Sequence, residues 1–281
     1  MARFRSKQRS GACARPPSLH AWLCAMVLCA APLGQAHAAV AWPGGARAAV
    51  SLAYDDALDS QLDNAVPALN KADLRASFYL QLSSPTIGKR LAAWRAAALR
   101  GHELGNHTLF HQCSSVGDDR SWVQPQRDLA STTVAQMRDQ ILLANTMLYA
   151  IDGRSERTLT LPCGDLLAAG QPYLPAVLSA FVAVKAGVTQ APPASMDEVD
   201  PGAVKVITPV GMSGKELIAL VQAAGAKGTM VNFTFHGIGG DYLSVSASAH
   251  QELVDYLAAH RKEYWTDSFI NIMKHVKAHT R

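Results

Sequence analysis

Most of this 281-residue sequence has no surplus of charge of one sign. Charged residues make up 17% of the chain, and the formal net charge is +4. The first fifteen residues, MARFRSKQRSGACAR, hold five positive charges and no acidic residue, so the rest of the chain is close to neutral. Because nucleic-acid binding depends on a basic surface, this composition argues against a nucleic-acid partner.

The sequence also lacks an apolar run long enough to cross a membrane. The stretch LHAWLCAMVLCAAPLG at 19–34 is shorter than the roughly 20 residues that a spanning helix needs. It follows the cationic start and precedes Ala36-His37-Ala38, a small-residue cleavage pattern. We predict a secretory signal peptide over 1–38, cut before Ala39, with a secreted or periplasmic product that is not stably inserted in a membrane. A retained membrane anchor is the alternative.

Cysteine is scarce outside this leader. Three of the five cysteines lie within the predicted signal peptide, which leaves Cys113 and Cys163 in the mature chain. In an oxidising compartment, two cysteines are expected to form a disulfide. An unstrained bridge that closes a loop of about 50 residues is worth about 4 kcal/mol by chain entropy. The alternative roles are metal ligand and thiol nucleophile.

No repeat, low-complexity tract or linker interrupts residues 40–281, so we predict one domain over 39–281. Segments rich in β-formers alternate with amphipathic helical segments. This rhythm predicts an α/β fold with a parallel sheet covered by helices, either a barrel or a doubly wound sheet. The expected strands are 48–54, 76–82, 102–107, 157–162, 180–187, 203–210 and 228–236. The expected helices are 62–73, 87–101, 132–152, a segment between 162 and 180, 213–225, 246–261 and one within 263–279.

Polar residues follow several of the expected strands. Asp55 and Asp56 end the first strand, His107 and His111 follow the third, and His236 follows the seventh. In parallel α/β folds the chemistry lies at the carboxyl ends of the strands. This placement indicates an enzyme.

The two histidines and a carboxylate predict a metal site. Side chains four apart on a helical turn project to the same side, so His107 and His111 can reach one ion, and Asp56 adds an oxygen ligand. Three protein ligands leave positions open, as in catalytic sites, and they suit zinc and other divalent transition ions. Successive side chains of a strand diverge, which leaves Asp55 to accept a proton from water. The alternatives are a solvated histidine pair and a helix-capping Asp-Asp pair.

These motifs resemble the polysaccharide deacetylases with a NodB homology domain, carbohydrate esterase family 4. Tyr54-Asp55-Asp56 matches the family's T-F-D-D-G motif at both aspartates, and the segment from His107 to His111 matches H-[ST]-x-x-H in full. The resemblance spans roughly 48–280 and implies a distorted (β/α) barrel of seven or eight parallel strands. It also implies a divalent cation held by Asp56, His107 and His111, with Zn²⁺ expected ahead of Co²⁺ or Ni²⁺, and Asp55 as the general base.

The family's third motif falls on 160–163 and departs from the family pattern. Thr160 replaces the arginine that usually orients the base, and Arg157 is a candidate to replace it. Cys163 takes the position whose backbone N–H helps to bind the oxyanion, and Pro162 and Gly164 flank it.

The last motif falls on 234–236, and the resemblance makes His236 the general acid. Glycines 237, 239 and 240 follow it with a spacing that fits neither a dinucleotide-binding nor a P-loop fingerprint, and they indicate a turn. The aspartate that orients this histidine in the family has no clear match. The candidates are Asp197, Asp200, Asp241 and Asp267, of which we favour Asp241 and Asp267.

The resemblance implies a metal-dependent hydrolase that removes acetyl groups from an acetylated polysaccharide or oligosaccharide, with N-acetyl groups preferred. Metal-bound water would attack the acetyl carbonyl, with Asp55 as base and His236 as acid. Trp122, on the long loop after the second motif, is expected to line the cleft. Two alternatives stay open: an O-acetyl esterase acting on xylan with the same site, and an inactive glycan-binding barrel, which the change to Thr160 favours.

Overall fold

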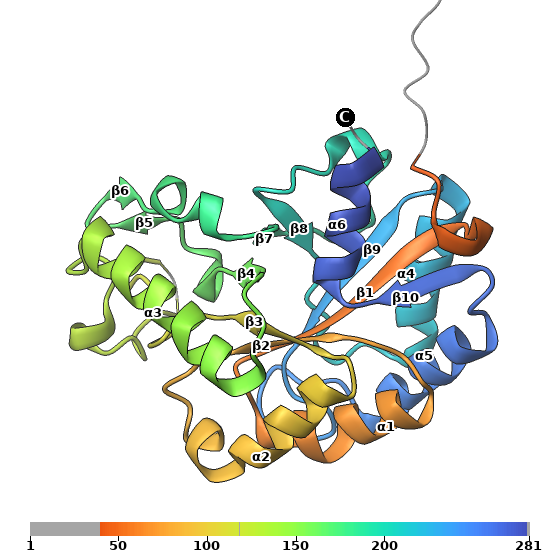
Figure 1. Ribbon diagram of the computed structural model, residues 1–281, viewed down its shortest axis with the longest axis horizontal. Coiled ribbons are helices and arrows are strands. Elements are labelled where there is room, and N and C mark those ends of the chain that lie inside the picture. The colour runs from red at the N-terminus through yellow and green to blue at the C-terminus, as the bar shows by residue number, and fades with distance from the viewer. Residues whose placement is uncertain (1–39, 118, 280–281) are drawn as a thin grey trace, which may run out of the picture. The chain divides into compact units, whose positions relative to one another are not determined.

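Strand β1 (Ala48–Asp55) organises a parallel sheet in the computed structural model, which describes residues 40–117 and 119–279 (Figure 1). The predicted signal peptide lies outside the described residues. One edge of β1 pairs with β9 (Met230–Phe235). The other edge pairs first with β10 (Tyr264–Asp267) and then, further along, with β2 (Ser77–Leu80). All of β1 is buried, which explains why its sequence is nearly continuously apolar up to the two aspartates.

From β2 the sheet runs through four more strands and returns to β9. The strand order is β2-β3-β4-β7-β8, with all neighbours parallel. Ile207, just beyond β8, forms a bridge to Phe233 of β9, and its N–H donates to the carbonyl oxygen of Asn232 at 2.9 Å. The result is the predicted nearly closed barrel of seven parallel strands, with β10 added beside β1. The bounds are β3 (Glu103–Asn106), β4 (Leu159–Thr160), β7 (Val184–Val188) and β8 (Val204–Val206).

The α-helices cover the outside of the barrel. Helix α3 packs on β3, α4 on β1 and β9, and α6 against β1 (Figure 1). Helices α3 and α4 each begin at a capping box, and they end at the left-handed glycines Gly153 and Gly228. Both features are local sequence signals for where a helix begins and ends. The bounds are α1 (Val66–Lys71), α2 (Pro85–Leu99), α3 (Val134–Asp152), α4 (Gly214–Lys227), α5 (Ala247–Ala259) and α6 (Phe269–His279).

Side chains of β1 alternate between two environments. Leu52 and Tyr54 belong to the large core between the barrel and its helices, together with the fully buried Trp94. Ala53 packs with Tyr79 in a second cluster that includes the barrel interior. Because the alternation has a period of two, Asp55 shares the inward side with Ala53. The Asp55 carboxylate at the end of β1 therefore lies at the open end of the barrel.

The segment between β4 and β7 corrects the sequence prediction. In place of the helix expected between 162 and 180, the chain forms a small hairpin and three single turns of 3-10 helix, the first of them Pro162–Gly164. Gly170 has a φ of 72°, and a proline follows two residues later. Prolines lack the N–H that a helix needs, so apolar spacing alone misleads here. The short elements are β5 (Leu167–Ala168), β6 (Gln171–Pro172), Leu174–Ala176 and Leu178–Ala180.

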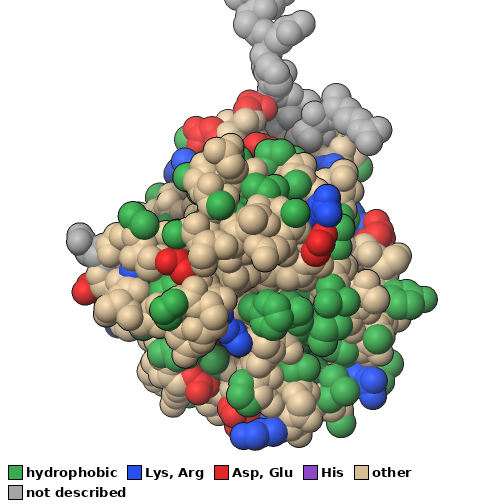
Figure 2. All heavy atoms as spheres, turned by 90° about the vertical axis from the view of Figure 1, so that its left-hand side faces the viewer, with side chains coloured by type: hydrophobic (Ala, Val, Ile, Leu, Met, Phe, Trp, Pro, Cys, Tyr) green, Lys and Arg blue, Asp and Glu red, His purple; other side chains and the backbone are tan. Residues whose placement is uncertain are grey.

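Figure 2 shows the face of the molecule that carries the β5–β6 hairpin and α3. Charged side chains of both signs are scattered over this face, and none gathers into a broad patch of one sign. Among residues 40–117 and 119–279, no helix is both long enough and apolar enough to cross a bilayer.

Candidate active site

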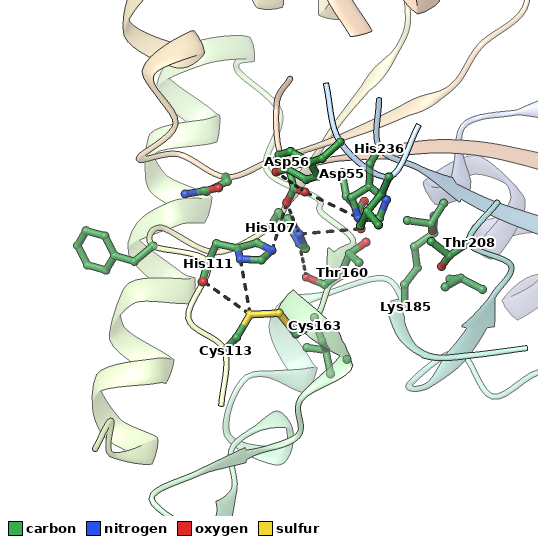
Figure 3. Close-up of a pocket in the computed structure, with 18 of the residues that line it drawn as sticks. Asp55, Asp56, His107, His111, Cys113, Thr160, Cys163, Lys185, Thr208 and His236 are labelled. Carbon is green, nitrogen blue, oxygen red and sulfur yellow. Dashed lines mark hydrogen bonds and ion pairs between the residues drawn. A yellow bond between two sulfur atoms is a disulfide. The ribbon is translucent and has the colours of Figure 1, made fainter. Parts of the chain in front are cut away.

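A cleft of about 960 Å³ opens at the carboxyl ends of the barrel strands (Figure 3). Its lining includes Asp55 and Asp56 from the end of β1, His107 and His111 from the loop after β3, and His236 after β9. The polar residues that were predicted from separate motifs therefore share one cavity. The walls add Phe110, Trp122, Arg127, Val188, Tyr242 and Leu243, and the indole of Trp122 is exposed.

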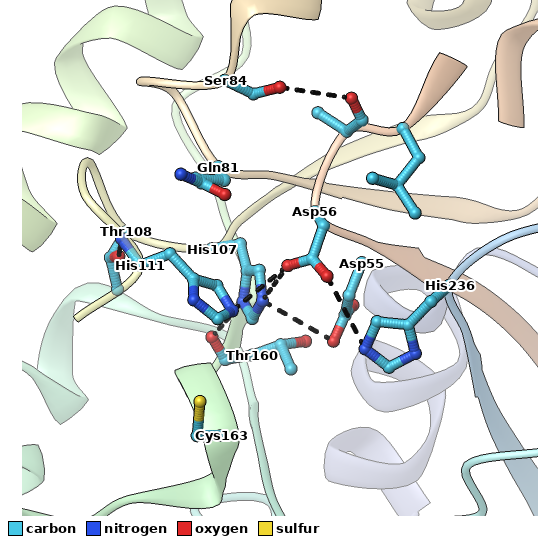
Figure 4. Close-up of polar contacts among 12 residues, drawn as sticks. Asp55, Asp56, Gln81, Ser84, His107, Thr108, His111, Thr160, Cys163 and His236 are labelled. Carbon is cyan, nitrogen blue, oxygen red and sulfur yellow. Dashed lines mark hydrogen bonds and ion pairs between the residues drawn. The ribbon is translucent and has the colours of Figure 1, made fainter. Parts of the chain in front are cut away.

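Asp56 and the two histidines converge on one point (Figure 4). Oδ1 of Asp56 lies 3.1 Å from Nε2 of His107 and 3.2 Å from Nε2 of His111. The ligand atoms of all three residues lie within 4.8 Å of one another. Although it is this close to both rings, the buried Oδ1 has no aligned hydrogen-bond partner among the described residues. One carboxylate oxygen and two imidazole nitrogens aimed at a common point form a donor set that fits a divalent cation.

Neighbouring groups orient the members of this set. Nδ1 of His107 lies 2.9 Å from the carbonyl oxygen of Thr160, which can only accept a hydrogen bond. Nδ1 therefore carries a proton in this contact, which leaves Nε2 as the nitrogen that can act as a metal ligand when the ring is neutral. The hydroxyl of Tyr242 donates to Oδ2 of Asp56 at 2.9 Å, so the two oxygens of that carboxylate have different partners.

The histidine pair does not lie on a helical turn, contrary to the prediction. It lies on a loop in which Thr108 and His111 have left-handed backbone, with φ of 62° and 51°. The amide of Thr108 donates to Oδ1 of Asn106 at 2.7 Å, and the hydroxyl of Thr108 accepts from the amide of His111 at 2.9 Å. Asp56 and Cys163 are also left-handed, with φ of 80° and 58°. Such strained conformations concentrate at functional sites.

Asp55 is buried beside Asp56, His107 and His111, and its carboxylate lies near the same nitrogen of His107 as that of Asp56. Its Oδ2 lies 3.9 Å from Nε2 of His107. Burial raises the pKa of Asp55, and the nearby positive charges of His107, Lys185 and His236 oppose that rise. The side-chain amide of Gln61 donates to the backbone carbonyls of Asp55 and His236, at 2.5 and 3.1 Å, and so ties the ends of β1 and β9 together. Gln61 begins a single π-helical turn, Gln61–Ala65, a feature common near functional sites.

The buried carboxylates of Asp55 and Asp56 make a positive charge favourable at this end of the barrel. Burial alone would raise the pKa of Asp56, but the contacts with His107 and His111 hold it well below its ordinary value. Burial alone would lower the pKa of His107, but Asp55 and Asp56 raise it to about 9. The cluster therefore favours a cation over neutral groups.

His236 faces the cluster from the β9 side. Its Nε2 lies 3.7 Å from Oδ2 of Asp56. Its Nδ1 is buried and has no hydrogen-bond partner among the described residues, so the two favoured acid-orienting aspartates do not serve that role here. Asp241 instead accepts from the amide of Ser60, and Asp267 accepts from the amide of Ser268 at the start of α6.

The predicted disulfide between Cys113 and Cys163 is present, with the two Cα atoms 5.9 Å apart. It joins the histidine loop to the segment after β4, and Sγ of Cys113 lies 3.7 Å from Nδ1 of His111. A disulfide sulfur is neither thiolate ligand nor nucleophile, so the two alternative roles do not apply to this state. Cys163 and Gly164 line the cleft, whereas Pro162 is buried behind them.

Arg157 does not compensate for Thr160. Its buried guanidinium forms an ion pair with Asp152, with Nη2 2.6 Å from Oδ1, and donates to two backbone carbonyls. These partners are Leu104 of β3, Asp152 at the end of α3 and Arg154 just after it, and none of them lines the cleft. Arg157 lies three residues before Thr160, which corresponds to about 10 Å of extended chain.

Two cleft residues were missed in the sequence. Tyr242 lies in the glycine-containing turn GIGGDY, which indicated only a loop, and its contact with Asp56 joins residues 186 positions apart. Lys185 lies in an apolar strand segment and lines the cleft while nearly completely buried. No local pattern marks either residue, since both contacts arise from barrel closure.

Comparisons with known proteins agree with this geometry. The family model described as "Polysaccharide deacetylase" matches residues 44–174, a range that includes both aspartates, the histidine loop and the Thr160–Gly164 segment. No curated protein matches the chain by sequence. Over this part of the chain the sequence is therefore similar to the polysaccharide deacetylases, in agreement with the resemblance that the two motifs carry.

Solved structures show the same fold at low identity. A candidate polysaccharide deacetylase from Mycobacterium smegmatis is 16% identical with a TM-score of 0.61, covering 86% of this chain and 94% of the other. The Xyl-CE4 domain of a multidomain xylanase from the hindgut metagenome of Trinervitermes trinervoides is 12% identical with a TM-score of 0.51, covering 80% and 89%. A peptidoglycan N-acetylglucosamine deacetylase, in complex with a hydroxamate-type compound, is 15% identical with a TM-score of 0.51, covering 83% and 90%.

Proposed function

We propose that this protein is a metal-dependent hydrolase that removes acetyl groups, foremost N-acetyl groups, from an acetylated glycan. The observation that carries the proposal is the convergence of Asp56, His107 and His111 in a cleft that also holds Asp55 and His236. The match of residues 44–174 to the polysaccharide deacetylase model supports the same class of reaction.

Asp56, His107 and His111 would hold the cation. Zn²⁺ suits their two nitrogens and one oxygen, and Co²⁺ and Ni²⁺ are the alternatives. When bound, a divalent cation supplies Lewis-acid polarisation of the acetyl carbonyl and acidifies water. The carbonyl oxygen of Thr160 and the hydroxyl of Tyr242 keep the donor atoms aimed at that point.

The chain's own groups would carry the protons. Asp55 is within reach of the shared point and accepts a proton from the attacking water, whose oxygen bonds to the acetyl carbon. The backbone N–H of Cys163 is proposed to donate to the developing oxyanion. His236, on the facing side, gives a proton to the leaving nitrogen as the C–N bond breaks. The products are acetate and a free amine on the glycan.

We also propose that the protein is secreted or periplasmic. The support is the signal-peptide pattern over 1–38 and the disulfide in the cleft wall, because such bonds persist in oxidising compartments.

Acetate release tests the proposal and separates it from its alternatives. Purified protein is incubated with N-acetylated oligosaccharides and with acetylxylan, before and after treatment with a chelator. We expect release from the N-acetylated substrates that chelation removes and added Zn²⁺ restores. Release from acetylxylan alone would identify an O-acetyl esterase. Glycan binding without release from either substrate would identify an inactive binding barrel. Asp55→Asn is the matched control, since it removes the base and keeps the side-chain size.

A further inference from the structure

Lys185 is a buried cation to which the proposed reaction assigns no role. It lies on β7 beside Thr160 of β4, and only 1% of its surface is exposed. Lysine is rarely buried to this degree without a partner. Its Nζ lies 3.2 Å from the hydroxyl of Thr234 and 3.4 Å from the carbonyl oxygen of Phe233, both on β9. The side chain therefore crosses the barrel interior from β7 to β9.

Aromatic rings surround this ammonium group. Nζ lies 4.8 Å from the ring centre of Tyr79 and 5.1 Å from that of Phe269, both within the range of cation–π contact. Gly105 on the next strand leaves room for the Tyr79 ring, because a Cβ there would lie 2.5 Å from ring atoms. The barrel thus contains a built cage for one positive charge.

Two buried carboxylates lie on β1 and β3, the two strands that pair with the strand of Tyr79. Asp55 is the register partner of Tyr79, and Glu103 is the register partner of Ser77, two residues earlier on β2. Glu103 is satisfied locally, because it accepts from the hydroxyl of Ser77 at 2.6 Å and the amide of Ile270 at 3.0 Å. Oδ1 of Asp55 has no hydrogen-bond partner among the described residues. Asp55 is therefore the carboxylate with an unpartnered oxygen, because its basic neighbour, Nε2 of His107, lies near the other oxygen, Oδ2, at 3.9 Å.

Lys185 is the lysine in the same cleft whose charge can act on this oxygen. Among the residues that line the cleft, the lysine and arginine side chains are Lys185 and Arg127, and Arg127 donates to the carbonyl oxygen of Phe110 at 2.8 Å. Arg157 is paired with Asp152, and position 160 holds a threonine. Burial lowers the pKa of Lys185, and Asp55 and Glu103 oppose this, which leaves it at about 8. The ammonium form therefore predominates at neutral pH.

We infer that Lys185 is a positioning residue whose charge orients the Asp55 carboxylate from inside the barrel. The inference that this positioning serves turnover rests on the proposed function, whereas the charge pair itself does not.

A double-mutant cycle tests the charge pair without any substrate. Melting temperatures are measured for the wild type, Lys185→Met, Asp55→Asn and the double variant, all in chelator. If Lys185 and Asp55 interact, the shifts in melting temperature of the two single variants should not add. The double variant should then melt about 3 °C or more above the additive value. The control cycle uses Lys205→Met, an exposed lysine on the neighbouring strand β8, and should be additive. An additive cycle for Lys185 would overturn the inference.

Turnover then tests the positioning role. Lys185→Met is expected to keep its metal content and to change KM less than about threefold, while kcat falls about 100-fold, within the range of proton-transfer contributions. In Lys185→Ala, propylammonium should restore part of kcat, and 1-propanol of equal size should not. Full turnover by Lys185→Met in an active protein would overturn the positioning role and leave the proposed function standing. An inactive wild type with a non-additive cycle would overturn the proposed function and leave the charge pair.

Discussion

His107 donates a hydrogen bond through Nδ1 to the backbone carbonyl of Thr160, at 2.9 Å. The contact joins the histidine loop after β3 to strand β4, so the second and third motifs support each other directly. Because the acceptor is a backbone atom, the side chain at position 160 can change without loss of the bond. The orientation of His107 therefore does not depend on the threonine side chain.

Replacing one histidine of the cluster should abolish metal retention. In His111→Ala one of three donors is lost, and we expect metal content after dialysis to fall from near one equivalent to background, together with acetate release. Inductively coupled plasma mass spectrometry measures the first quantity. The matched control is His279→Ala, an exposed histidine near the end of α6, which should retain both. A metal-replete, active His111→Ala protein would contradict the proposed ligand set.

Tyr242 should tune the metal site without being a ligand. Removing its hydroxyl in Tyr242→Phe leaves Oδ2 of Asp56 without its 2.9 Å donor. Loss of such an outer contact costs about 10- to 100-fold in metal affinity. Competition with a fluorescent chelator measures this, and circular dichroism should show an unchanged fold. Equal affinity in the two proteins would show that the hydroxyl does not orient Asp56.

The acid role of His236 predicts a dependence on the leaving group. For an N-acetyl substrate, whose nitrogen must be protonated to leave, His236→Ala should lower kcat by about 10²- to 10⁴-fold. For 4-nitrophenyl acetate, whose leaving group departs as a stable anion, the loss should be much smaller. Parallel steady-state assays on the two substrates give the comparison. Equal losses on both would assign His236 to binding rather than to proton donation.

The disulfide should stabilise the fold and hold the histidine loop. Mass spectrometry of unreduced protein is expected to show the peptides of Cys113 and Cys163 joined. The variant with both cysteines changed to alanine should lose about 4 kcal/mol of unfolding free energy in urea, as expected for a loop of about 50 residues. Its metal should also dissociate faster, because Cys113 lies two residues from His111. Two free thiols in the unreduced protein would rule out the bridge.

Buried neutral histidines should make the protein acid-sensitive. His250 is 1% exposed, its Nε2 lies 2.6 Å from the hydroxyl of Tyr54, and burial lowers its pKa to about 4. The unfolded chain takes up this proton near pH 6.5, so stability rises with pH across this window. As pH falls from about 6.5 to 4, this one group should remove about 3 kcal/mol of unfolding free energy.

Urea unfolding at several pH values measures the effect. His250→Gln should show a shallower loss of stability between pH 6.5 and 4, whereas His279→Gln, at an exposed position, should follow the wild type. His102 has its pKa lowered to about 4 by burial and by nearby arginines, and should contribute the residual slope. An unchanged pH dependence in His250→Gln would show that the buried ring is not the source.

The sequence by itself determined the alternation of strands and helices, and hence the α/β class. It also determined the placement of Asp55, Asp56, His107, His111 and His236 just after strands, because β-propensity, helix caps and strand-end polarity are local properties. The pairing of two lone cysteines was likewise foreseeable from their number. The expected helix between 162 and 180 failed because helical spacing of apolar residues cannot outweigh prolines and a left-handed glycine.

Only the tertiary structure decided which distant side chains share a layer of the barrel. Barrel closure and strand register bring Tyr242 to Asp56 and the Lys185 ammonium group to Thr234. Each of these contacts depends on which strands are neighbours and on their relative shift, and a shift of one residue would reverse the side on which every side chain points. That information is a property of the packed sheet, and no single segment contains it.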